Sequence, residues 1–163
     1  MIEPGATFPA VPVKIIGSYG VRDTDSARAL SSGIVVFFTL PGAFTPTCHN
    51  NHVPGYLDLA EDLKAAGVDQ IVCGTVNDHH VVQAWFKSLG APSAIQFLAD
   101  GNGELAKALG LDRDMSAGGM GVRYNRAAII LDNGKIRAAF TEHSSGVVTS
   151  SGAPAILSVL RGN

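Results

Sequence analysis

The sequence predicts an α/β protein with a central mixed β-sheet and helices on both faces. Apolar, β-branched runs of strand length alternate with amphipathic helical patterns through most of the chain, which favours parallel pairing through helical crossovers. Two further apolar runs flank the turn Asp132-Asn133-Gly134, a strong signal for an antiparallel hairpin. With 163 residues the chain is long enough to bury its own core, so residues 1–163 are expected to form a single domain.

The expected strands are short apolar runs. The clearest is GIVVFFTL, residues 33–40, whose β-branched and aromatic content is typical of a strand buried on both faces. The other expected strands are residues 13–16, 69–76, 94–100, 126–131 and 136–141. Helical spacing of apolar residues, with glycine at several carboxyl ends, predicts helices over 56–67, 82–89, 104–109 and 155–160.

Composition and charge exclude several classes of function. The chain is 46% hydrophobic and 16% charged with a net charge of −2, so it lacks the basic surface expected for binding nucleic acid or an anionic membrane. No apolar run approaches the length of a membrane span and no signal peptide is visible, so we expect a cytoplasmic location. Two cysteines provide no disulfide framework.

Cys48 is the residue that points most directly to chemistry. It lies in the polar segment TPTCHNNH, four residues beyond the expected strand 33–40, and reactive groups gather at the carboxyl ends of strands in open α/β sheets. A free thiol with a pKa near 8.5 is only ~3% ionised at neutral pH. The N–H groups of a helix start and a hydroxyl from Thr45 or Thr47 would favour the thiolate. Pro54 has no N–H to continue the helix, so we expect a kink after this turn.

The second cysteine, Cys73, is expected to have a structural role. Cys73 lies within QIVCGTV, an apolar strand pattern, and is expected to be a core residue. A thioredoxin-type Cys-x-x-Cys pair would need a cysteine three residues from Cys48, but positions 45 and 51 are Thr45 and Asn51. The sequence therefore contains no dithiol motif.

The spacing of residues in this region bears on three other chemistries. Cys48 and His52 are one helical turn apart, so a Cys/His acyl-transfer pair is conceivable, although the two would not converge from separate elements. The scattered histidines match no zinc spacing; they are His49, His52, His79 and His80. The glycine-rich stretch 118–121 lacks the strand-before, helix-after context of a nucleotide loop and is expected to be a flexible connection. We expect neither a metal nor a cofactor.

The segment PGAFTPTCHNNHVPGY resembles the active-site signature of the peroxiredoxins, Pro-x-x-x-Thr-x-x-Cys. The fuller pattern PGAFTPTC…H.PGY is similar to the subgroup called type-5 or atypical peroxiredoxins. The resemblance covers most of the chain, because three later segments are also similar to that subgroup; they are VCGTVNDHHVVQAWFKSLG, FLADGNGELAKALGL and GGMGVRYNRAAIILDNGKI. It implies a thioredoxin-like fold and a homodimer.

The resemblance also implies an activity, that of a thiol-dependent peroxidase acting on hydrogen peroxide and alkyl hydroperoxides. Cys48 would be oxidised by the hydroperoxide to a sulfenic acid. Thr45 would hydrogen-bond the thiolate and the peroxide oxygen, and Pro41 would shield the pocket. Arg126 would hold the thiolate and the transition state. Arg123 is the rival for this role, but strand alternation places it on the opposite face and the order of the family motif favours Arg126.

Two features depart from the family pattern. Members with an internal disulfide carry a resolving cysteine in the segment matching SSGVVTSSGAP, where this chain has no cysteine but has serines, among them Ser150 and Ser151. The reductant is therefore expected to be an external thiol, either glutathione with glutaredoxin or thioredoxin. Ala127 replaces the aromatic residue usual after the matched arginine. Two other functions remain open for Cys48: a peroxide-responsive redox sensor or binding module, and a cysteine-dependent hydrolase.

Overall fold

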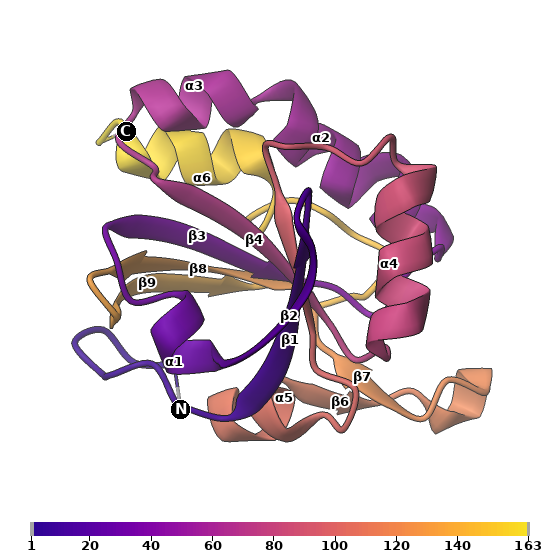
Figure 1. Ribbon diagram of the computed structural model, residues 1–163. Coiled ribbons are helices and arrows are strands. Elements are labelled where there is room, and N and C mark those ends of the chain that lie inside the picture. The colour runs from indigo at the N-terminus through magenta and orange to yellow at the C-terminus, as the bar shows by residue number, and fades with distance from the viewer. Residues whose placement is uncertain (1, 163) are drawn as a thin grey trace.

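The computed structural model of the protein, which describes residues 2–162, has a seven-stranded mixed sheet at its centre (Figure 1). The strand order is β2-β1-β5-β4-β3-β8-β9. β3, β4 and β5 are parallel, whereas β1, β2, β8 and β9 pair antiparallel with their neighbours. The strands are β1 (Pro12–Gly17), β2 (Gly20–Asp25), β3 (Ile34–Thr39), β4 (Gln70–Thr75), β5 (Gln96–Ala99), β8 (Ala127–Asp132) and β9 (Lys135–Thr141).

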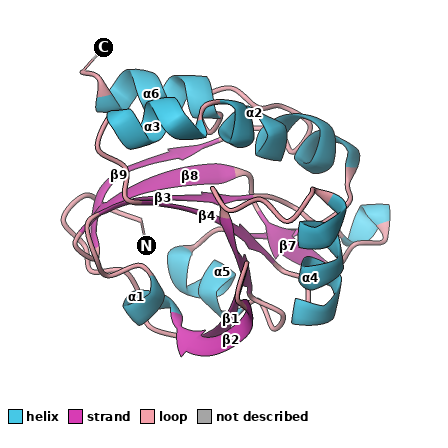
Figure 2. Ribbon diagram, turned by 45° about the horizontal axis from the view of Figure 1, so that its top comes forward, coloured by secondary structure: helices cyan, strands magenta, loops and turns pink. Residues whose placement is uncertain are grey.

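Helices cover both faces of this sheet, which confirms the predicted α/β class (Figure 2). α2, α3, α4 and α6 pack on one face, and α1 and α5 pack on the other. None of the helices within residues 2–162 combines the length and hydropathy needed to cross a membrane. The helices are α1 (Ser26–Ala29), α2 (Val53–Asp58), α3 (Ala60–Ala65), α4 (His79–Ser88), α5 (Glu104–Leu109) and α6 (Ala153–Leu160).

β3 shows why the central strands read as continuous apolar runs. Val36 and Phe38 pack into the cluster under α2, α3, α4 and α6, while Val35 and Phe37 pack into the cluster under α1 and α5. Because successive side chains of a strand point to opposite faces, a strand covered on both sides places nearly all of its side chains in an apolar core.

Several elements differ from the sequence predictions. The expected helix 56–67 is divided into α2 and α3 at Leu59, where the backbone has φ −102° and ψ 10°. Two polar elements, β2 and α1, were not predicted. The stretch 118–121, expected to be a flexible connection, lies in the turn between two short paired strands. These strands are β6 (Asp112–Asp114) and β7 (Val122–Tyr124).

The topology brings three segments together at one edge of the sheet. Thr39, the last residue of β3, pairs with Ala127 at the start of β8, and Ala127 pairs with Thr141 at the end of β9. Arg126 directly precedes β8 and Glu142 directly follows β9, and the Glu142 N–H donates to the Arg126 carbonyl at 2.9 Å. The loop that leaves β3 therefore enters its helix beside both of these residues.

Candidate active site

Cys48 lies in the first turn of the helix that follows β3. Helical backbone begins at Pro46, a position where the missing proline N–H interrupts no intrahelical bond. The His49 N–H donates to the Thr45 carbonyl at 2.8 Å, which is the first bond of the helix. Cys48 thus occupies the helix start that the sequence predicted.

The expected kink takes the form of a π-helical turn over Cys48–His52. The Val53 N–H donates to the Cys48 carbonyl, five residues back instead of four. Pro54 comes next and has no N–H to donate, so the regular ladder cannot resume at that residue. Such π-turns within α-helices are frequent at functional sites.

The Cys48 sulfur is fully buried and is held by an arginine. Arg126, only 1% exposed, donates from Nη2 to Cys48 Sγ at 3.2 Å. Its Nε and Nη2 also donate to the Ser145 carbonyl at 3.0 and 2.8 Å. Nη1 lies 2.8 Å from Nδ1 of His52. The guanidinium is therefore anchored at every nitrogen.

Arg126 forms no ion pair with a carboxylate among the described residues. The ion pairs among the described residues are Lys14 with Asp23 and Arg28 with Asp25, both at the surface. A buried cation is costly unless an anion accompanies it. The Cys48 sulfur accepts a hydrogen bond from Arg126, and a thiolate at this position would supply the anion that the buried cation lacks.

His52 completes the contacts of the guanidinium. Because a guanidinium only donates, Nδ1 of His52 accepts from Arg126, and Nε2 donates to the Ser151 carbonyl at 3.0 Å. Burial, aided by the charge of Arg126, lowers the pKa of His52 to about 4, although the Ser151 bond and Glu142 act in the opposite direction. His52 is thus neutral and has no nitrogen directed at Cys48, so the Cys/His acyl-transfer pair is not formed.

The low pKa of His52 predicts a pH-dependent stability. The unfolded state binds a proton near pH 6.5 that the native state does not bind until about pH 4, so stability falls as the pH is lowered through this window. We expect the titration of His52 to lower the free energy of unfolding by about 2 kcal/mol between pH 7 and pH 5. Urea unfolding of wild type and His52→Gln at both pH values measures it. An equal loss in the two proteins would contradict the prediction.

Thr45 and Pro41 lie at the same small pocket as Arg126, but the role expected of Thr45 needs a correction. Its hydroxyl donates to the Gly42 carbonyl at 2.7 Å. A hydroxyl has one proton, so the expected donation from Thr45 to the thiolate is not made in this structure. The lone pairs of Oγ1 remain able to accept a hydrogen bond. Pro41 is buried at the start of the same loop.

A small pocket opens beside Cys48. Its volume is about 150 Å³, and it includes both Arg126 and Thr45. Its other lining residues are Pro41, Pro46, Thr47, Met115, Met120, Ser145 and Gly146. The two methionines, from the connection between β6 and β7, were missed because neither periodicity nor motif marks them. The pocket suits a substrate of a few atoms.

Arg123 has a different task from Arg126. Its Nε donates to the Met120 carbonyl at 2.8 Å and its Nη1 to the Pro41 carbonyl at 3.3 Å. Arg123 lies in β7, whereas Arg126 precedes β8 in the central sheet, so the expected separation of the two side chains arises from two sheets and not from alternation along one strand. Arg123 braces the loop before Cys48 and makes no hydrogen bond to the sulfur.

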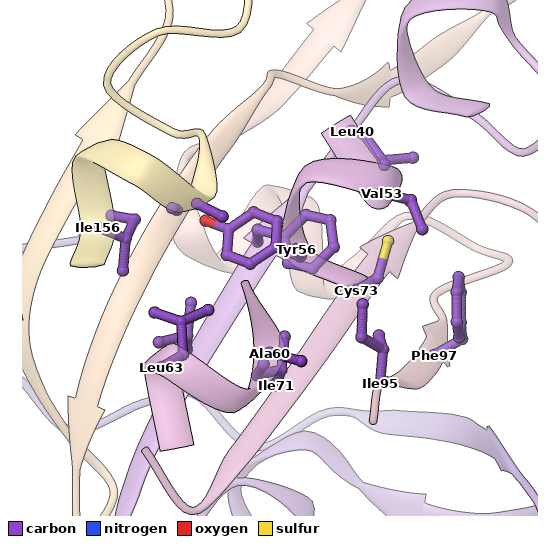
Figure 3. Close-up of a cluster of buried hydrophobic side chains, with 14 of the residues drawn as sticks. Leu40, Val53, Tyr56, Ala60, Leu63, Ile71, Cys73, Ile95, Phe97 and Ile156 are labelled. Carbon is purple, nitrogen blue, oxygen red and sulfur yellow. The ribbon is translucent and has the colours of Figure 1, made fainter. Parts of the chain in front are cut away.

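Cys73 is a core residue, as predicted. It lies fully buried on β4, in register with Phe38 of β3 and Phe97 of β5. Figure 3 shows it among apolar side chains that include Leu40 and Val53. Burial raises the pKa of the Cys73 thiol well above its ordinary value, and the nearby Cys48 acts in the same direction. Both cysteines are free.

The histidines do not assemble a metal site. Among residues 2–162, no three His, Cys, Asp or Glu side chains are grouped so that they could hold a metal ion. His79 and His80 face each other at the start of α4, and His49 accepts a hydrogen bond at Nδ1 from Trp85.

The fold and the site together define a class of protein. A mixed sheet carries a buried cysteine at the start of the helix that follows a central strand, and an arginine without a carboxylate partner donates to its sulfur. A thiolate stabilised in this way is a nucleophile. The class is that of cysteine-dependent redox enzymes.

Comparison with known proteins gives the family. The family model described as Redoxin matches residues 4–157. Peroxiredoxin-2C from Oryza sativa subsp. japonica is 49% identical over 136 residues, which cover 83% of each chain. Peroxiredoxin-2B from Arabidopsis thaliana is 43% identical over 163 residues, covering 98% of this chain and all of that protein. The chain therefore belongs to the redoxin family, as a peroxiredoxin.

Solved structures agree. The crystal structure of reduced Prx3 from Vibrio vulnificus in complex with H₂O₂ is 39% identical, covers 98% of this chain and 99% of its own, and superposes with a TM-score of 0.90. This confirms the thioredoxin-like peroxiredoxin fold. The protein is an enzyme of this family, a thiol-dependent peroxidase.

Proposed function

We propose that this peroxidase reduces hydrogen peroxide and alkyl hydroperoxides through Cys48 and is regenerated by an external thiol. The observation that carries the proposal is the hydrogen bond of 3.2 Å from Arg126 Nη2 to Cys48 Sγ, made by a buried cation without a carboxylate partner. The small pocket shared by Arg126 and Thr45 admits a hydroperoxide group.

In the first step the Cys48 thiolate attacks the terminal oxygen of the hydroperoxide. An S–O bond forms and the O–O bond breaks, which leaves Cys48 as sulfenic acid and releases an alkoxide or hydroxide that takes a proton from water. Thr45 Oγ1, whose proton is held by Gly42, accepts a hydrogen bond from the peroxide O–H. Arg126 stabilises the charge that shifts to the leaving oxygen, and Pro41 keeps water from the pocket.

The second step uses a thiol from outside the chain. The thiol sulfur attacks the sulfenic acid, water leaves, and a mixed disulfide remains on Cys48; a second thiol then releases Cys48 as thiolate. Cys73 is fully buried, and Ser150 and Ser151 occupy the segment where the family places a resolving cysteine. We propose glutathione with glutaredoxin, or thioredoxin, as the reductant.

The proposal includes a homodimer in a reducing compartment, the cytoplasm. Apolar side chains next to pocket residues support the dimer, since Phe44 is 51% exposed and Val122 and Val147 are each 44% exposed. The presence of two cysteines without a disulfide supports the compartment.

Counting turnovers tests this function against the sensor. With excess glutathione and glutaredoxin, and in parallel with reduced thioredoxin, we expect at least one system to sustain the consumption of many equivalents of peroxide. Consumption of one equivalent of peroxide followed by arrest in both systems would instead favour a redox sensor. Ester cleavage without peroxide consumption would favour a hydrolase.

Mass spectrometry after one dose of peroxide with glutathione should find the glutathione adduct on Cys48. A disulfide between Cys48 and Cys73 would contradict the external route.

A further inference from the structure

A buried carboxylate organises the segment that follows β9. Glu142, 4% exposed, accepts at Oε2 from the backbone N–H groups of Thr149 and Ser151 at 2.6 and 3.0 Å, and from the Ser151 hydroxyl at 2.6 Å. Its Oε1 accepts from the hydroxyls of Thr149 at 2.6 Å and Ser150 at 3.5 Å. Burial alone would raise the pKa of Glu142, but these bonds together lower it to about 2. Residues 149–151 are thus folded around a permanent anion.

The same segment supplies the two carbonyls on which the active-site arginine depends. The Ser145 carbonyl accepts from Nε and Nη2 of Arg126. The Ser151 carbonyl accepts from Nε2 of His52, and also from the Tyr56 hydroxyl at 2.7 Å. His52 then offers Nδ1 to Nη1 of Arg126. All three nitrogens of the guanidinium are held directly or indirectly by residues 145–151.

We propose that Glu142 is a positioning residue for Arg126, acting by folding residues 142–151 into the turn that holds the guanidinium against Cys48. The inference deepens the proposed function and rests on it. Without the carboxylate, two backbone N–H groups would lose their acceptor and the turn would have to rearrange. The Ser151 carbonyl would move, His52 would lose its fixed orientation, and Nη1 of Arg126 would lose its acceptor.

Two variants of Glu142 separate shape from charge. In Glu142→Gln, the amide oxygen takes the place of Oε2 and still accepts from the backbone, while the NH₂ group faces the hydroxyls of Thr149 and Ser150, which rotate to accept. In Glu142→Leu, both backbone N–H groups have no acceptor. The proposal therefore expects glutamine to preserve the turn and leucine to release it.

Asp100 provides a matched control. It is 2% exposed and accepts from the backbone N–H groups of Leu105 and Ala106 at 3.2 and 2.9 Å and from the Tyr124 hydroxyl at 3.0 Å. These partners belong to the core on the opposite face of the sheet from α2 and α6. Asp100→Leu removes an equally buried carboxylate acceptor without touching the turn around Arg126.

The experiment measures two reactions of Cys48 in the reduced proteins, oxidation by hydrogen peroxide and alkylation by iodoacetamide. We expect Glu142→Leu to slow the peroxide reaction on the order of 10²-fold, the size of effect that small misplacements of catalytic groups produce. Alkylation should fall by a smaller factor, because its transition state contains no breaking O–O bond for Arg126 to stabilise. Glu142→Gln and Asp100→Leu should keep peroxide rates within about threefold of wild type.

Several results would overturn the inference: an unchanged peroxide rate in Glu142→Leu, an equal loss in Asp100→Leu, or an equal loss in Glu142→Gln. If Glu142→Leu does not fold, the double variant Thr149→Val/Ser151→Ala replaces it and should slow the peroxide reaction severalfold.

The NMR signal of the Arg126 Nε–H is a readout independent of activity. We expect a distinct, slowly exchanging signal in wild type that is lost in Glu142→Leu; if wild type consumes no peroxide, the proposed function fails while this signal still decides the positioning.

Discussion

Cys48→Ser protein is expected to consume hydrogen peroxide no faster than buffer containing the thiol reductant. A serine hydroxyl is not ionised at neutral pH and needs a neighbouring base to act as a nucleophile. His52, the histidine whose ring is hydrogen-bonded to Arg126, has Nδ1 on Arg126 and Nε2 on the Ser151 carbonyl, so it cannot serve as that base. Peroxide loss under excess glutathione and glutaredoxin, and under reduced thioredoxin, measures the effect.

Cys73→Ser is the matched control for this prediction. It also replaces a fully buried sulfur with a hydroxyl, but on β4, where no hydrogen bond joins the side chain to Arg126. We expect its peroxide rate to remain within about threefold of wild type, with a loss of stability of about 1–3 kcal/mol from burying a hydroxyl in an apolar site. The assignment of Cys48 as the reactive cysteine would be rejected if Cys48→Ser consumed peroxide at the wild-type rate. It would also be rejected if folded Cys73→Ser consumed none.

Arg126→Met is expected to lower the second-order rate constant for hydrogen peroxide by about 10³-fold, or about 4 kcal/mol of transition-state free energy. Complete ionisation of a thiol that is ~3% ionised raises the rate only about 30-fold, worth ~2 kcal/mol. The rest of the expected loss in transition-state stabilisation must come from hydrogen bonds whose strength increases as the O–O bond breaks. Methionine keeps an unbranched side chain in the cavity but removes the charge and every donor.

Arg123→Met is the control for Arg126→Met, since the two arginines lie three residues apart and both contribute donors near the pocket. Arg123 binds only the Met120 and Pro41 carbonyls, so its loss should loosen the loop and lower the rate by about tenfold or less. Stopped-flow mixing of the reduced proteins with hydrogen peroxide gives both constants. Equal effects of the two substitutions would show that loop support, and not the contact from Arg126 to Cys48, governs the rate.

The sheet could be predicted from the sequence because its central strands are buried on both faces. In the run IVVFFT the first five residues are apolar and only the last, Thr39, is polar, so the pattern depends little on context. β2 has the sequence GVRDTD and lies at the edge of the sheet with an exposed or half-buried pattern, so its strand character arises from pairing with β1 and not from its own residues.

The candidate site divides in the same way. Pro41, Thr45 and Cys48 lie within eight residues, and their proximity follows from local chain geometry, so the motif was sufficient to place them. Arg126 was matched through the resemblance to the family. The roles of His52 and Glu142 could not be foreseen. His52 depends on residues far away in the chain, such as Ser151, whose carbonyl its Nε2 contacts. Glu142 contacts residues 149–151 nearby in the chain, but this turn meets His52 only in the folded protein.

The sequence by itself determined the fold class and marked Cys48 as the candidate reactive cysteine, because hydrophobic periodicity and the spacing around Cys48 are local properties that do not depend on tertiary contacts. Only the tertiary structure decided which way each polar group faces: that the Thr45 hydroxyl donates to Gly42, that His52 accepts from Arg126, and that the Ser151 N–H donates to Glu142. Hydrogen-bond direction depends on which donors and acceptors meet, and here they meet only after β3, β8 and β9 have paired.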